Sequence, residues 1–97
     1  MEKNKIQIKT KNEDLKGVYS NLMIISNRTK EEFVLDFLMV LPPEGVLSSR
    51  IIVSPDHLKR MIKTFQTSIE KYEKQFGNIE DSKVSEEPER EIGFIAK

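Results

Sequence analysis

The sequence predicts an α+β domain in which an antiparallel meander of three to four strands is followed by one long C-terminal helix packed on the sheet. Three observations predict this fold class. β-forming residues dominate positions 17–53, polar and proline-containing stretches divide that region into strands, and helical apolar periodicity runs over positions 54–77. The 97 residues are enough for a single domain of this kind.

The helix is the element whose start, end and apolar side can all be read from the residues. Ser54 can cap the free amides of the first turn, and Pro55 suits the first helical position. Gly77 can adopt the positive φ that closes the last turn. The apolar residues recur every three or four positions and form one stripe, which needs one partner surface: Leu58, Met61, Ile62, Phe65, Ile69, Tyr72 and Phe76.

The predicted strands follow one another without an intervening helix. Residues 18–26 are rich in β-formers and uncharged, which predicts the first main strand, and the polar residues 27–31 predict a turn. Residues 32–41 predict the second strand, residues 42–45 with their two prolines end it, and residues 46–53 predict the third. Ile6 and Ile8 alternate with polar residues, so a short edge strand could form in residues 1–16, a segment otherwise expected to be flexible.

Both faces of the second predicted strand are apolar. Phe33, Leu35 and Phe37 lie on one face, and Val34, Leu38 and Val40 on the other. Because one helix covers only one face of a small sheet, we expect a second copy of the chain to cover the remaining apolar surface. The sequence therefore predicts a homodimer or a higher homo-oligomer, formed by sheet stacking or by helix pairing.

The chain after the helix has a different composition. Residues 17–77 are expected to form the single α+β domain, and residues 78–97 an acidic, flexible tail. The last apolar cluster of the tail, Ile92, Phe94 and Ile95, could dock on a partner or form a transient strand. A frayed terminus is the common alternative for such an ending.

The residue types for several kinds of chemistry are missing. The chain has no Cys, which excludes disulfides, thiol nucleophiles and cysteine-ligated metals. Its single histidine, His57, has no second histidine to complete a metal site, and a surface position at the helix start explains it better. No G-x-S-x-G elbow and no glycine-rich phosphate loop occurs. We therefore expect no metal, no cofactor, no catalytic residue and no enzymatic activity.

Charge and hydropathy bear on where the chain acts. Sixteen basic residues balance sixteen acidic ones, so there is no overall attraction to nucleic acid or to anionic membranes. No run approaches the roughly 20 apolar residues that span a bilayer, and the N-terminus lacks the apolar centre of a signal peptide. We expect a cytoplasmic protein that does not contact membranes.

Asp36 and Arg50 are charges within otherwise apolar predicted strands. A regular hairpin through the proline turn places them opposite each other on one face. A structural ion pair that fixes strand register or subunit docking is the interpretation we favour, because an unpaired carboxylate at this depth would be costly. A polar site for a ligand or a proton is the alternative.

Three functions of different classes remain open at this point. A binding or assembly module is favoured, because apolar surfaces are evident and a catalytic constellation is not. A regulator that binds nucleic acid, which we regard as unlikely, would use a basic strip. The weakest is a small-ligand protein or an enzyme built around Asp36 and Arg50. The basic strip would consist of Lys3, Lys5, Lys9, Lys11, Lys59, Arg60 and Lys63.

Three phrases of the sequence, taken in order, resemble a known family. GVYSNL, then EFVLDF, then SRIIVSPDHLKRMIKTFQTSIEKYEKQFG are similar to the domain-of-unknown-function family numbered 3467, with its patterns Y-[SA]-N, EFVLDF and SRI-x-x-[ST]-P-[DE]-H-x-K-R. The similarity covers residues 6–77 and includes Asp36, Arg50, Pro55 and His57. It implies a small bacterial protein without an established activity and supplies no catalytic residue. The order of strands and helix also resembles, in outline only, the export chaperone SecB.

Overall fold

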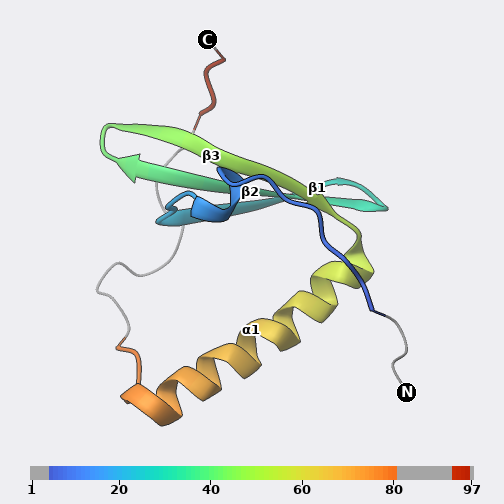
Figure 1. Ribbon diagram of the computed structural model, residues 1–97. Coiled ribbons are helices and arrows are strands. Elements are labelled where there is room, and N and C mark those ends of the chain that lie inside the picture. The colour runs from blue at the N-terminus through green and yellow to red at the C-terminus, as the bar shows by residue number, and fades with distance from the viewer. Residues whose placement is uncertain (1–4, 81–92, 97) are drawn as a thin grey trace.

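The computed structural model describes residues 5–80 and 93–96, and it has the predicted α+β architecture. A single 3-10 turn, η1 (Asp14–Lys16), precedes three strands and a helix: β1 (Leu22–Thr29), β2 (Glu32–Leu41), β3 (Glu44–Val53) and α1 (Pro55–Phe76). Figure 1 shows the sheet at one end of the molecule and α1 running away from it. The order of strands in the sheet is β1-β2-β3, with antiparallel neighbours, as a meander requires.

The β2–β3 hairpin fixes the register on which the rest of the fold depends. Pro42 and Pro43 form a two-residue turn, and Leu41 pairs directly with Glu44. β3 therefore begins two residues earlier than the predicted position 46, because the prolines alone make the turn and Glu44 and Gly45 join the ladder. A bulge at Ser48 separates the two halves of the hairpin.

β1 differs from its predicted range at both ends. It begins at Leu22 and continues through Thr29, so the polar residues 27–29 belong to the strand and only Lys30 and Glu31 turn. The Asn27 side chain accounts for the longer strand, since its amide donates to the carbonyls of Thr29 and Glu32 across the turn.

The edge strand that could form around Ile6 and Ile8 is absent from the described residues. Their side chains are 80% and 83% exposed, and the chain around them has no regular structure. Alternation with lysines is a local signal, but a strand also needs an edge to pair with and a surface to cover its apolar side. Among the described residues, neither a strand edge nor a covering surface lies beside these two isoleucines.

The boundaries of α1 confirm the prediction from its capping residues. The Ser54 hydroxyl oxygen accepts a hydrogen bond from the backbone N–H of His57 at 3.1 Å, and Pro55 occupies the first helical position. At the other end Gly77 has φ of 97°, and its N–H donates to the carbonyl of Glu73 at 2.9 Å.

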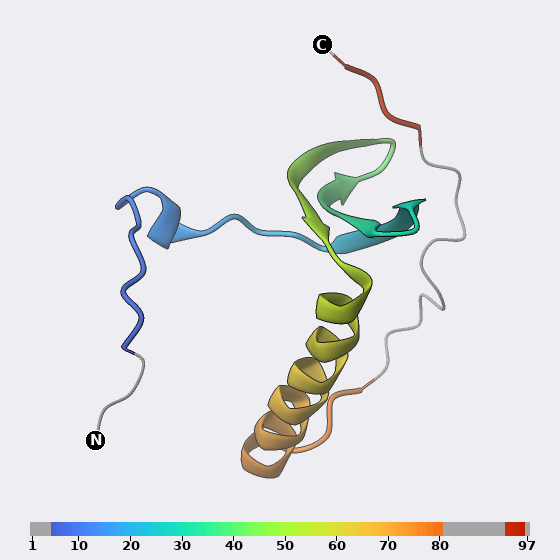
Figure 2. The ribbon, with the colours of Figure 1, turned by 90° about the vertical axis from the view of Figure 1, so that its right-hand side faces the viewer.

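The helix packs on the sheet only through its beginning. Leu58 and Met61 are half-buried and α1 contacts β2, but no α1 residue is fully buried. Figures 1 and 2 show why: α1 starts directly below the end of β3 and then diverges from the sheet. The core is accordingly small and lies within the sheet and its junction with the helix, at Val34, Leu35, Leu38 and Val53.

α1 is also too polar to cross a membrane. Within residues 5–80 and 93–96, no helix is long and apolar enough to do so.

Candidate functional site

The face of the sheet that carries Asp36 is the first candidate site. Asp36 is only 3% exposed, and it lies opposite Arg50 in the ladder as predicted, although the hairpin is not regular: the bulge at Ser48 brings the two residues opposite each other. Arg50 donates two parallel hydrogen bonds to the carboxylate, from Nε to Oδ1 at 2.6 Å and from Nη2 to Oδ2 at 3.0 Å. The bidentate geometry fixes the plane of the guanidinium, while the Arg50 side chain remains 45% exposed.

The environment of this pair favours its charged form. The hydrogen bond to Asp36, and then the coulombic attraction to the same carboxylate, raise the pKa of Arg50 above its ordinary value. A cation whose pKa is raised by folding stabilises the fold below its ordinary pKa, and this stabilisation is lost only as the pH rises through the folded-state pKa. Arg50 therefore stays charged over the pH range of ordinary protein function, and its titration supplies no switch there.

Asn21 and Ser20 connect the segment before β1 to β2. The Asn21 side-chain amide donates to the carbonyl of Val40 and its oxygen accepts from the N–H of Val40, both at 2.9 Å. The Ser20 hydroxyl donates to the carbonyl of Leu38 at 3.0 Å. Asn21 thus extends the β1–β2 ladder with a side chain where the backbone has left the strand.

The same segment reaches the third strand. The hydroxyl of Ser48, at the bulge, donates to the carbonyl of Tyr19 at 3.2 Å. Residues 19–21 therefore bridge from β2 to β3, which explains why β1 cannot start as early as its composition suggests.

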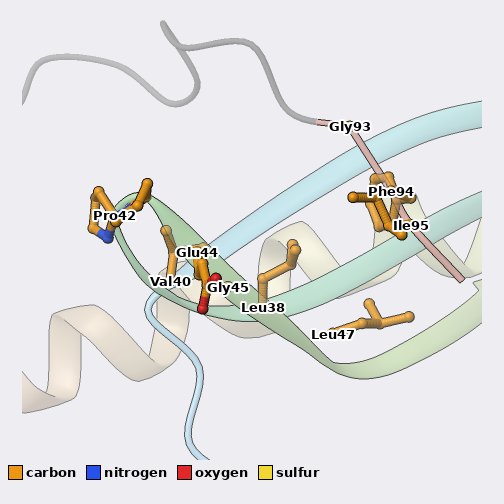
Figure 3. A pocket seen from close by; sticks show the side chains of 10 residues that line it. Leu38, Val40, Pro42, Glu44, Gly45, Leu47, Gly93, Phe94 and Ile95 are labelled. Carbon is orange, nitrogen blue, oxygen red and sulfur yellow. The ribbon is translucent and has the colours of Figure 1, made fainter. Parts of the chain in front are cut away.

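An apolar pocket lies beside the pair, toward the proline turn. Its volume is about 280 Å³, and Figure 3 shows residues 93–95 lying across the hairpin there. Asp36 does not line this pocket. This pocket is therefore not the polar cavity that a ligand site built on Asp36 requires. The residues that line it are Leu38, Val40, Pro42, Pro43, Glu44, Gly45, Leu47, Gly93, Phe94 and Ile95.

The stripe of α1 beyond its first turns is the second candidate site. Its five large side chains are between 47% and 65% exposed, so about half of the stripe is open to solvent. They are Ile62, Phe65, Ile69, Tyr72 and Phe76. The rings of Tyr72 and Phe76 contact each other in a tilted arrangement, with centroids 4.9 Å apart and an interplanar angle of 46°.

The remaining predicted groups are dispersed. His57 is exposed at the start of α1. Among residues 5–80 and 93–96, no three His, Cys, Asp or Glu side chains are grouped so that they could hold a metal ion.

The residues of the basic strip are not gathered on one surface. Arg60 is paired with Asp56 at 3.1 Å. Figure 2 shows the segment with Lys5, Lys9 and Lys11 well separated from α1, and Lys3 lies outside the described residues.

The model of a protein family of unknown function, DUF3467, matches residues 1–81. The chain belongs to the DUF3467 family. Comparison with curated proteins and with solved structures finds no match. The DUF3467 match includes β1, β2, β3 and α1, and it ends before residues 93–96.

The fold gives a physical role to each phrase by which the chain resembles DUF3467. Tyr19, Ser20 and Asn21 bridge the strands, Asp36 belongs to the pair, and Arg50 completes it. The roles of Ser20, Asn21 and Ser48 were not predicted from the sequence. The one available signal was an Asn directly before an apolar strand, which is typical of a side chain that replaces a backbone partner.

Proposed function

We propose that this DUF3467 chain is a non-enzymatic assembly and binding module, and that α1 pairs with α1 of a second copy. The half-exposed stripe of α1 is the single observation that carries the proposal. An apolar surface of this size is comparable to the largest patch on a typical monomer, and such patches are often functional.

The exposed apolar area of the stripe fits a pair of identical helices. Five side chains of this size, about half exposed, present roughly 400 Å² of apolar surface per chain. Two stripes together contribute roughly 800 Å², and the flanking residues bring the total close to the roughly 1,000 Å² expected of a specific interface.

The spacing of the stripe fits helix pairing of the coiled-coil type. From Leu58 the apolar positions advance alternately by four and three residues, through 62, 65, 69, 72 and 76. This is the a/d pattern in which side chains of one helix pack between four of another.

Charge complementarity favours one relative direction of the two paired helices. In an antiparallel pair centred between Phe65 and Ile69, the Lys59 side chain faces Glu73 of the second copy, twice by symmetry. A parallel pair would place Lys59 and Glu73 beside uncharged serines instead. The antiparallel arrangement is therefore the one we propose.

Replacing Ile69 by Glu tests the pairing. We expect the unchanged chain to have twice its monomer mass in light scattering at micromolar concentration. Ile69→Glu brings two carboxylates into the apolar seam and raises the dissociation constant by more than about 100-fold, giving a monomer.

Thr67→Glu is the matched control, since it adds the same charge to the same helix on the side away from the stripe. It should leave the mass unchanged. An unchanged chain that is monomeric at micromolar concentration, or an Ile69→Glu variant that keeps the larger mass, would contradict the proposal.

Single cysteines test the direction, because the native chain contains none. In the antiparallel pair the two copies of Gln66 face each other, whereas the two copies of Gln75 lie about 25 Å apart along the axis. With a short bifunctional maleimide, Gln66→Cys should form covalent dimers in high yield and Gln75→Cys should not. Equal yields at the two positions would contradict the antiparallel arrangement.

A further inference from the structure

Residues 93–95 lie against a surface of the β2–β3 hairpin. The prediction of a flexible tail does not call for such a contact. Phe94 and Ile95 line the pocket together with Leu38, Val40 and Leu47 of the hairpin (Figure 3). The Phe94 ring also lies 5.7 Å from the guanidinium carbon of Arg50. One aromatic residue of the tail thus contacts both an apolar pocket and a fixed cation.

The Asp36–Arg50 pair prepares this cation for an aromatic partner. Asp36 holds one edge of the guanidinium, through Nε and Nη2, which leaves its flat face free for stacking. Because Asp36 is buried and Arg50 is half-exposed, the pair presents that flat face at the surface of the sheet.

Gly45 shapes the adjoining floor of the pocket. It pairs with Val40, and a Cβ at position 45 would lie 3.0 Å from the Val40 Cγ2 atom. The hairpin therefore has a shallow apolar depression beside a planar cation. This combination suits an extended segment in which an aromatic residue is followed by an aliphatic one.

The family match includes the residues of this surface but not the tail residues that lie on it. Leu38, Val40, Leu47 and Arg50 lie within the matched residues 1–81, whereas residues 93–95 lie beyond them. We propose that this surface, the hairpin groove, is a peptide-binding site, and that the chain's own tail is its tethered ligand, anchored by the half-exposed Phe94, with Ile95, 82% exposed, at the rim. The tail then controls access to the groove, independently of any pairing through α1.

Cysteine pairing in the full-length chain tests the occupant. Leu47→Cys with Ile95→Cys should form an intramolecular disulfide at least about 10-fold faster than Thr29→Cys with Ile95→Cys, because a docked tail raises the local concentration of one thiol near the other. Adding Phe94→Ala to the first pair should slow it to the control rate.

Each other outcome overturns the proposal. Equal rates for the two cysteine pairs would show a tail that does not dock. A disulfide between two chains would assign the groove to the tail of a second copy instead of the chain's own tail.

The groove as a binding site is tested by a fluorescent peptide with the sequence EIGFIAK. Full-length Phe94→Ala should bind it at least about 10-fold more tightly than the unchanged chain, whose own tail competes at millimolar effective concentration. A peptide in which Phe is replaced by Ala is the control and should not bind. Equal binding of the labelled peptide to both chains, or to neither, would overturn the proposal.

Discussion

Replacing Arg50 by Met should lower the melting temperature by roughly 10 °C. The variant keeps the length of the side chain but leaves the Asp36 carboxylate, which is 3% exposed, without its two hydrogen bonds. A buried charge without a partner is among the most costly single defects in a protein. Thermal unfolding followed by circular dichroism measures the effect.

The opposite deletion should cost less, which makes the pair of variants informative. Asp36→Asn keeps the shape of the side chain and leaves Arg50 half-exposed, where water can solvate the guanidinium. The double variant, Asp36→Asn with Arg50→Met, should recover part of the melting temperature lost in Arg50→Met. If Arg50→Met melted at the temperature of the unchanged chain, the pair would have no structural role.

Leu35→Ala should destabilise the chain by about 3 kcal/mol, because Leu35 is the most buried apolar residue of those that the structure describes and a cavity would remain in a small core. Leu41→Ala is the matched control, on the same strand and the same face but 73% exposed, and it should change stability by much less. Urea unfolding of both variants measures the difference. Equal losses would mean that Leu41 is covered in solution to the same extent as Leu35.

The helix and the β2–β3 hairpin could be predicted from the sequence because their signals are local. Ser54, Pro55 and Gly77 act on amides within one turn, and the two prolines mark the turn of the hairpin, whereas the bulge at Ser48 that brings Asp36 opposite Arg50 was not predicted. These interactions depend on residues that are near in sequence or directly opposite in a hairpin.

The parts that could not be predicted depend on distant groups. Asn21 extends the β1–β2 ladder through side-chain bonds to Val40, which is 19 residues away. Likewise, the acidic composition after Gly77 gives no sign that Phe94 lies beside Arg50. The apolar stripe of α1 has the same period whether it covers its own sheet or a second copy, so sequence alone could not decide between them.

The β1-β2-β3 order, in which each strand pairs with its neighbour along the chain, also bears on how quickly the molecule forms. Hairpins close short loops, which cost little chain entropy, and α1 follows β3 directly. Of the interactions described above, two join residues that are farther apart in the sequence. They are the hydrogen bond between Ser48 and Tyr19 and the contact between Arg50 and Phe94. Each chain should therefore fold rapidly on its own, and the meeting of two copies would be the slow, concentration-dependent step.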